Sequence, residues 1–233
     1  MKKYLTVFYL LAAVCLFGNY SFAQKGRIKP KPRKEIMEAV STSNIQKDFL
    51  GEVEGGAYKN KFFGIKLNLP ESWLIQETQV NDAIKQAGSK SITGKTSQVQ
   101  KAYNNAMQRL TVLFTASKDI LGIENNATMI FSAEKSPPLV QIRNGQDYLR
   151  LNIQSFKKLQ LPPDFKYSET IKSEKFGTET FYSLDIERAT YDQRFYAIYR
   201  KGHSLFFTLT YSTEKDLETM KDVLRNSDFS WKE

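Results

Sequence analysis

The chain has 233 residues, 41% of them hydrophobic, and a formal net charge of +9 from 34 basic and 25 acidic residues. The excess is local: residues 1–34 hold eight Lys and Arg and no acid, which leaves 26 basic against 25 acidic residues in 35–233. A nucleic-acid-binding domain carries its basic residues on the fold itself, so this nearly neutral remainder excludes nucleic acid as a partner. Cys15 is the only cysteine and precedes the folded part, which excludes disulfides, thiol catalysis and cysteine metal sites there.

The first 23 residues have the three parts of a secretory signal peptide. Lys2 and Lys3 give a basic start, residues 4–17 carry no charge, and small residues precede a cut between Ala23 and Gln24. The apolar run is shorter than the roughly 20 residues of a membrane-spanning helix. We therefore expect an exported protein, periplasmic or secreted. The alternative is an uncleaved signal that anchors the chain in the membrane, because basic residues also follow the apolar run.

A basic, proline-containing segment follows the predicted signal. Its basic residues alternate with Pro30 and Pro32, which favours an extended chain. One interpretation is a solvated spacer. The other is a tether to anionic lipid head groups or another anionic envelope surface, where each basic residue contributes about 1 kcal/mol. The six basic residues are Lys25, Arg27, Lys29, Lys31, Arg33 and Lys34.

The remaining organisation follows from the spacing of apolar residues. Residues 24–56 form a linker that includes a weak predicted helix over 35–50, and residues 57–233 form a single domain of ordinary size. Alternation of apolar and polar residues predicts strands, and apolar residues at every third or fourth position predict helices. In chain order we expect a strand over 65–69, helices over 78–89 and 96–109, strands over 110–116 and 128–133, and a helix over 146–160.

The C-terminal third predicts an antiparallel sheet with strands near 167–174, 178–188, 192–200 and 203–212. Lys201-Gly202 suits a two-residue hairpin turn, because glycine accepts a positive φ. That turn pairs Tyr196 with Phe207 and leaves apolar side chains such as Phe206 on the opposite face. Since both faces are apolar, each needs a cover. The predicted fold class is α+β, a central antiparallel sheet flanked by helices on both faces.

The last predicted helix begins at Thr213, whose hydroxyl can cap it while Asp216 lies in the first turn. Its buried stripe consists of Leu217, Met220 and Leu224. Asn226 is the expected stop, and a short extension with Phe229 and Trp231 packs back on the domain.

Two segments together resemble the PsbP-like superfamily of PsbP and DcrB-like exported proteins. The first, residues 58–73, contains Tyr58-x-Asn60, then Phe63-Gly64-Ile65, then Pro70 and Trp73; the second is the hairpin over 196–210 with the following helix and Ser227-Asp228-Phe229. The resemblance implies a sheet sandwiched by helices. It also implies an accessory binding role without catalysis, since relatives include an extrinsic photosystem II subunit, a Ran-binding nuclear import factor, DcrB and secretion-effector chaperones. An exported bacterial chain argues against the photosynthetic and nuclear roles.

The residues that could act in catalysis or bind a metal form no recognisable motif. His203 lies beside the hairpin turn and is expected to be a solvent-exposed turn residue, because a metal site needs several ligands. Asp185 and Glu187 share one face of a strand with Glu179; paired carboxylates can cleave glycosides, and a solvated strand face is the simpler interpretation. The sequence contains no Gly-x-Ser-x-Gly elbow and no glycine-rich phosphate loop. We predict no catalytic residue, metal ligand or cofactor.

Aromatic residues leave one further alternative open. Side chains of the last two strands could line a groove for an apolar ligand or peptide, or they could fill the core between sheet and helices. The four residues are Phe195, Tyr199, Phe206 and Tyr211.

Three functional hypotheses follow. The first is a non-enzymatic exported protein that binds an envelope protein through residues 78–109 or the sheet edge near 110–133. The second is a binder of the membrane surface or of lipid, held by residues 25–34. The third is a hydrolase that uses carboxylates such as Asp185 and Glu187.

Overall fold

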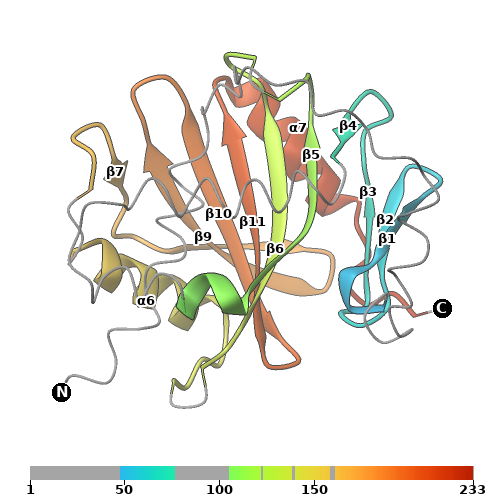
Figure 1. Ribbon diagram of the computed structural model, residues 1–233, viewed down its shortest axis with the longest axis horizontal. Coiled ribbons are helices and arrows are strands. Elements are labelled where there is room, and N and C mark those ends of the chain that lie inside the picture. Colours follow the sequence, from blue (N-terminus) through green and yellow to red (C-terminus); the bar gives the residue numbers. More distant parts are fainter. Residues whose placement is uncertain (1–47, 77–104, 122, 138–139, 158–160, 233) are drawn as a thin grey trace.

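The computed structural model describes residues 48–76, 105–121, 123–137, 140–157 and 161–232 (Figure 1). Within these residues, a main sheet of eight strands runs in the order β4-β5-β6-β11-β10-β9-β7, with β8 also paired to β9, and a second sheet has the order β1-β2-β3. The main strands are β4 (Leu74–Ile75), β5 (Leu110–Ser117), β6 (Thr128–Lys135), β7 (Lys166–Tyr167), β8 (Lys172–Phe176), β9 (Glu179–Glu187), β10 (Asp192–Arg200) and β11 (His203–Tyr211). The small sheet contains β1 (Glu52–Glu54), β2 (Ala57–Asn60) and β3 (Ile65–Asn68), and the helices are α6 (Gly145–Phe156) and α7 (Glu214–Arg225).

The predicted hairpin of β10 and β11 is confirmed. Lys201 and Gly202 form its turn with φ values of 50° and 76°, the positive pair that a tight hairpin needs. The register places Tyr196 opposite Phe207 and Ile198 opposite Leu205. One side of the sheet therefore receives these four apolar side chains.

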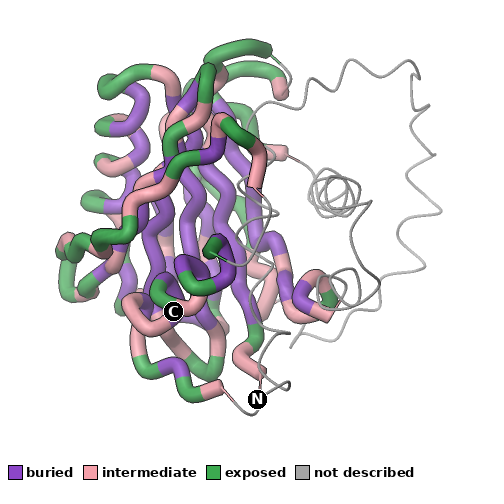
Figure 2. Tube along the Cα trace, turned by 90° about the vertical axis from the view of Figure 1, so that its left-hand side faces the viewer, coloured by how far each residue is buried: buried purple, intermediate pink, exposed green. Residues whose placement is uncertain are grey.

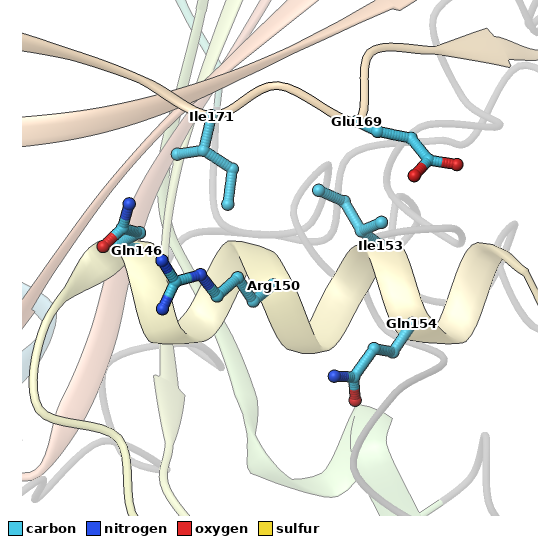
Figure 3. A pocket seen from close by; sticks show the side chains of 6 residues that line it. All are labelled: Gln146, Arg150, Ile153, Gln154, Glu169 and Ile171. Carbon is cyan, nitrogen blue, oxygen red and sulfur yellow. The ribbon is translucent and has the colours of Figure 1, made fainter.

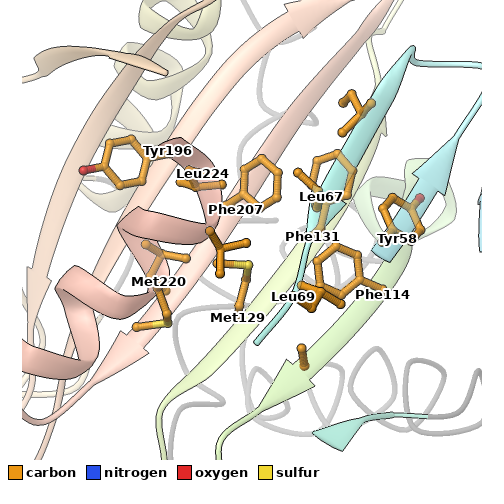
Figure 4. Close-up of a cluster of buried hydrophobic side chains, with 14 of the residues drawn as sticks. Tyr58, Leu67, Leu69, Phe114, Met129, Phe131, Tyr196, Phe207, Met220 and Leu224 are labelled. Atoms are coloured by element: carbon orange, nitrogen blue, oxygen red, sulfur yellow. The ribbon is translucent and has the colours of Figure 1, made fainter. Parts of the chain in front are cut away.

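That side is covered by α7 and by the small sheet (Figure 4). Phe131 and Phe207 stack with ring centroids 4.2 Å apart at its centre. Thr213 caps α7 by accepting a hydrogen bond from the backbone N–H of Asp216 at 3.2 Å. The helix then buries the predicted stripe of Leu217, Met220 and Leu224.

The opposite side of the sheet is covered by α6. Tyr148, Leu149, Ile153 and Phe156 pack there in one buried cluster with sheet residues that include Phe195, Ala197 and Phe206. Asn144 caps this helix by accepting from the N–H of Asp147 at 2.9 Å. The α+β class with helices on both faces is thus confirmed, and Figure 2 shows the buried strands between the two covers.

The C-terminal extension is fastened to the small sheet and to β10. Phe229 is buried and its ring centroid lies 4.9 Å from that of Phe181. Lys66 and Asp228 exchange backbone hydrogen bonds of 2.8 and 2.9 Å. Arg200 donates to the carbonyl oxygens of Phe63 at 2.7 Å and Phe229 at 2.6 Å. The C-terminal extension and the turn between β2 and β3 therefore meet at the Arg200 side chain.

Some expected elements differ from the structure. The single strand predicted over 167–174 is two strands, β7 and β8, separated by residues 168–171. Strands β1 and β2 were not expected in the glycine-rich stretch 51–60. Of the helices predicted over 35–50 and 96–109, only residues 48–50 and 105–109 lie among the described residues, and they are helical. The helix over 78–89 and the domain boundaries remain predictions.

Candidate functional site

His203 begins β11 and is not a solvent-exposed turn residue, which corrects the expectation. Its ring is half-buried and lies 5.5 Å from the rings of Phe49 and Phe63 and 6.0 Å from that of Phe62, measured between centroids. Its Nδ1 atom lies 2.8 Å from the carbonyl oxygen of Lys201. The imidazole therefore packs in an aromatic cluster at the edge of the small sheet.

Asp185 on β9 is held between two cations. Arg194 Nε lies 2.5 Å from one carboxylate oxygen and Lys172 Nζ lies 3.0 Å from the other. Burial by itself raises the pKa of Asp185, but the hydrogen bonds from Arg194 and Lys172 outweigh it and lower the pKa. A carboxylate held ionised in this way is a poor general acid.

The strand face that carries Asp185 is not solvated. This corrects the expectation that the carboxylates of this strand lie on a face exposed to water. Phe181 and Ser183 lie on the same face between Glu179 and Asp185, and both are buried. Glu179 pairs with Arg200, which belongs to the C-terminal attachment. Only Glu187, at the strand end, is exposed. Asp185 and Glu179 are thus bound in ion pairs, and Glu187 is exposed at the strand end.

The four aromatic residues of the last two strands do not share a groove. Phe195 and Phe206 are fully buried on the α6 side, whereas Tyr211 belongs to the cluster on the α7 side. Tyr199 is half-buried at the edge of the α6 side. They fill the two cores, which was one of the two interpretations.

Glu134 on β6 is a buried carboxyl that sequence analysis did not single out. It is 2% exposed and faces α6, where Tyr148 donates to it at 3.0 Å and Arg109 Nη2 lies 3.5 Å from its other oxygen. Burial raises the pKa of Glu134 to about 7, against the smaller opposing effects of Arg109 and Tyr148. This carboxyl can therefore change protonation state near neutral pH.

Around Glu134 the α6 side of the sheet carries buried polar side chains. Four of their oxygen atoms find no hydrogen-bond partner within the part of the chain that the structure describes: Ser132 Oγ, Gln193 Oε1, Ser204 Oγ and Thr208 Oγ1. The sequence did hold a signal for them, because Ser132 and Thr128 alternate with the apolar residues of β6, as Ser204 and Thr208 do on β11. Phe206 lies between Ser204 and Thr208 on the same face, and this apolar residue interrupts the polar pattern.

An exposed apolar corner lies at the β4 end of the sheet. We define it by Leu74, Ile75, Ile120 and Ile123, whose exposed fractions are 44%, 37%, 68% and 52%. Leu74 pairs with Ser117, the last residue of β5, so the β5–β6 loop begins next to β4. Ser117 Oγ donates to the carbonyl of Asp119 at the start of this loop at 2.7 Å. Of the large exposed hydrophobic residues in the described part, only Val53 lies elsewhere.

Acidic residues flank the apolar corner along the chain. Glu71 precedes Leu74, while Asp119 and Glu124 lie on either side of the loop isoleucines, and all three are exposed. None of these three carboxylates lies within ion-pair distance of a basic group of a described residue. Three exposed carboxylates therefore lie near the corner residues along the chain, and the exposed Lys118 of the same loop pairs with Asp216.

A shallow pocket of about 310 Å³ lies at the other end of the sheet, on the outer side of α6 (Figure 3). Ile153 and Ile171 point toward one another across it, from the helix and from the segment between β7 and β8. Its polar lining consists of Gln146, Arg150, Gln154 and Glu169. The pocket combines an aliphatic floor with a guanidinium and two amides.

Several predictions fall on residues that the structure does not describe, including the cut between Ala23 and Gln24 and the basic residues of 25–34. Within the described ranges, no three His, Cys, Asp or Glu side chains are grouped closely enough to hold a metal ion. Nor does any helix of those ranges have the length and hydropathy needed to cross a bilayer.

Comparison with known proteins gives distant structural likenesses. No protein-family model and no curated protein matches the chain. The chain is 12% identical to cyanobacterial PsbP (CyanoP) of Synechocystis sp. PCC 6803, over 75% of this chain and 93% of that one, with a TM-score of 0.39. It is 12% identical to LpqN, involved in cell envelope biogenesis of Mycobacterium tuberculosis, over 68% and 76%, with a TM-score of 0.33.

A third similar structure is a protein of unknown function from Pseudomonas aeruginosa, 21% identical over 50% of this chain and 80% of that one, with a TM-score of 0.36. The PsbP-like resemblance of residues 58–73 and 196–210, and membership of that superfamily, stay predictions. At these values the likenesses carry no argument about what the chain binds.

Proposed function

We propose that this chain is an exported, non-enzymatic accessory protein of the cell envelope, of the PsbP-like type, which binds a partner protein through the apolar corner. The observation that carries this proposal is the concentration of exposed Leu74, Ile75, Ile120 and Ile123 at one corner of the sheet. Scattered exposed aliphatic side chains are ordinary, whereas several gathered at one end of a sheet point to an interaction surface. Leu74 and Ile75 are successive residues of β4 and point to opposite faces, so the group spans the edge of the sheet.

The border of the corner favours a basic partner. Glu71, Asp119 and Glu124 are exposed carboxylates that neighbour the corner residues along the chain. Charges at the border of an interface chiefly steer encounter and select partners, while buried apolar contacts supply most of the affinity. The matching surface therefore presents aliphatic or aromatic side chains surrounded by Lys or Arg. Two of the four corner residues, Ile120 and Ile123, lie within the stretch near 110–133 that sequence analysis named as one possible contact surface, whereas Leu74 and Ile75 lie outside it.

The same geometry supports a role without catalysis. Asp185 is bound by Arg194 and Lys172, and the pKa shift described above keeps it ionised. His203 packs among phenyl rings and touches no carboxylate of a described residue. Glu134 has a pKa suited to acid–base chemistry, but it is enclosed between α6 and the sheet, where no substrate reaches it.

A matched pair of substitutions tests the proposal. Ile120→Asp places a charge at the centre of the corner, and Val53→Asp places one at the other exposed aliphatic residue, on β1. Photo-cross-linking from position 121 in cells that express each variant identifies the partner. We expect one cross-linked product with wild type and Val53→Asp that is lost with Ile120→Asp. The same product at equal yield in all three proteins would remove this corner as the contact surface.

The basic segment 25–34 supports a second candidate function, attachment to an anionic membrane surface. Six basic residues within ten positions, with no acid among them, fit the electrostatic attraction of such a surface. Replacement of all six by Gln should release the protein from vesicles of phosphatidylglycerol and phosphatidylethanolamine at moderate salt. If vesicle binding of the purified protein is the same with and without the replacements, the segment is a spacer.

A further inference from the structure

The pocket on α6 owes its outer wall to an interruption of the sheet. Tyr167 at the end of β7 pairs with Ile186 of β9, and Lys172 at the start of β8 pairs with Ser183. The two pairs are therefore five residues apart on the β7–β8 side and three residues apart on β9. Two extra residues therefore bulge from the strand. Such bulges re-aim side chains and are frequent beside functional sites.

A local hydrogen-bonded turn holds the bulge. The Ser168 hydroxyl accepts from the N–H of Thr170 at 3.0 Å and donates to the carbonyl of the same residue at 3.1 Å. The Ser168 N–H remains in the sheet, bonded to the carbonyl of Asp185 at 2.9 Å. The turn is thus anchored on β9, and it directs Glu169 and Ile171 toward α6 (Figure 3).

On the helix side, Arg150 is the group with unused bonding capacity. Its side chain is 58% exposed, and its nearest carboxylate, that of Asp147, is 4.0 Å away. Asp147 is already occupied by Arg143, which donates from Nε at 2.9 Å and from Nη2 at 3.3 Å. Arg150 makes no hydrogen bond to a residue that the structure describes. A guanidinium with free donors is suited to bind a carboxylate through two parallel hydrogen bonds.

The remaining lining fits the rest of a peptide. Gln146 and Gln154 lie four residues from Arg150 on either side along α6, and each amide can donate and accept. Ile153 is buried and Ile171 half-buried, so together they offer an aliphatic floor. The carboxylate of Glu169 is bound to Lys157 Nζ at 2.6 Å, which reduces its repulsion of an anion.

We infer that this pocket binds a peptide carboxylate next to an aliphatic side chain, with Arg150 holding the carboxylate and Ile153 and Ile171 holding the side chain. A volume of about 310 Å³ accommodates one or two residues. The carboxylate belongs either to a chain terminus or to an acidic side chain, and these two sources present the same chemistry to Arg150. The site lies at the opposite end of the sheet from the apolar corner, so it is independent of the proposed partner surface (Figure 1).

The test is a titration of the ¹⁵N-labelled protein followed by NMR. N-acetyl-leucine carries a terminal carboxylate, N-acetyl-Leu-Asp-amide carries a side-chain carboxylate, and N-acetyl-leucinamide is the neutral control. We expect at least one of the two acids to shift the amides of residues 146–154 and 169–171 saturably, with a Kd in roughly the millimolar range for so small a probe. The neutral amide should bind about three- to five-fold more weakly, as one exposed charge pair is lost.

Three variants separate the site from general effects. Arg150→Gln should bind the acids no better than the neutral amide, and Ile171→Ser should weaken acids and amide alike. Lys215→Gln, an exposed residue of α7, should leave binding unchanged. Whichever acid binds identifies the source of the carboxylate. The inference is overturned if neither acid gives saturable shifts at these residues, if acid and amide bind wild type equally, or if Arg150→Gln retains the preference for the acid.

Discussion

The hydroxyl of Tyr148 donates a 3.0 Å hydrogen bond to the carboxyl of Glu134, and this contact joins α6 to the central strand β6. Arg109, directly before β5, approaches the other oxygen of Glu134 at 3.5 Å. A carboxyl without water around it is costly to ionise, and these two donors recover part of that cost. The junction of helix and sheet therefore depends on the protonation state of one buried side chain.

The first prediction concerns pH and the Glu134→Gln variant. The pKa of Glu134 rises from 4.5 to about 7 on folding, so the folded state binds the proton more tightly than the unfolded state. The stabilisation from the protonated carboxyl is complete below pH 4.5 and is lost as the pH rises through 7. Glutamine keeps the shape without the charge. We expect Glu134→Gln to match wild type near pH 4.5 and to exceed it by about 3 kcal/mol at pH 8.

The measurement is urea unfolding of the purified proteins at several pH values. Glu124→Gln, at an exposed position of the β5–β6 loop, is the control for a general effect of removing one negative charge. A stability difference between Glu134→Gln and wild type that stays constant from pH 4.5 to 8 would contradict the assignment.

The second prediction concerns Gly145, the first residue of α6. A Cβ atom at this position would lie 2.0 Å from the carbonyl oxygen of Ala197 on β10, so α6 would have to move away from the sheet. Alanine is the better helix former by about 1 kcal/mol, and propensity alone predicts stabilisation. We expect the contact to dominate, and Gly145→Ala to destabilise by about 2–3 kcal/mol.

Thermal unfolding compares Gly145→Ala with Asn144→Ala, which removes only the helix cap and should cost about 1 kcal/mol. If Gly145→Ala proves as stable as wild type, the close approach of α6 to Ala197 is wrong.

The third prediction distinguishes two buried threonines on β11. Thr208 Oγ1 finds no partner among the described residues, whereas Thr210 Oγ1 accepts from Gln193 Nε2 at 3.0 Å. An unsatisfied buried hydroxyl costs about 1–3 kcal/mol, and valine has nearly the same shape without the polar atom. Thr208→Val should therefore stabilise the domain by about 1 kcal/mol, while Thr210→Val should destabilise it by a similar amount.

Chemical denaturation of the two variants in parallel checks this pair. Because both positions are buried on the same strand face, the comparison cancels effects of burial and β-propensity. Destabilisation by Thr208→Val would contradict this prediction. It would mean that the Thr208 hydroxyl is hydrogen-bonded in the folded protein, for example to a buried water.

The sequence predicted the C-terminal sheet well because its information there is local. Alternation with a period of two defines strands, and Lys201-Gly202 determines both the turn and the register that pairs Tyr196 with Phe207. The cap of Thr213 and the stripe of α7 are likewise within one helix length of each other. In each case the residues that specify the element are neighbours along the chain.

The missed features depend on contacts between distant segments. The bulge between β7 and β8 is recognisable only against the register of β9, because residues 167–174 alternate no differently from a continuous strand. Glu134 becomes notable only when Arg109 and Tyr148 converge on it. The apolar corner requires β4 to pair beside the β5–β6 loop. The sequence alone therefore could not predict the α6 pocket or the apolar corner, although the named stretch near 110–133 contains Ile120 and Ile123.

The final prediction concerns Arg200 and the C-terminal attachment. Its guanidinium donates to the carbonyls of Phe63 and Phe229 and pairs with Glu179, and its side chain is 18% exposed. Replacing it by methionine keeps the aliphatic stem but leaves two carbonyl oxygens and one carboxylate without this donor. We expect Arg200→Met to cost about 2–4 kcal/mol, because hydrogen bonds to a charged group are worth more than neutral ones.

Hydrogen exchange locates that loss. Amide protection should fall in the C-terminal extension around Phe229 and at Lys66, whose N–H donates to Asp228, before it falls in β10. Arg143→Met is the matched control, because the Arg143 side chain is 70% exposed and pairs with Asp147 only four residues away. Loss of this exposed ion pair should lower the free energy of unfolding by about 0.5 kcal/mol or less. Uniform loss of protection across the sheet in Arg200→Met would instead show that Arg200 supports the whole domain rather than its C-terminal attachment.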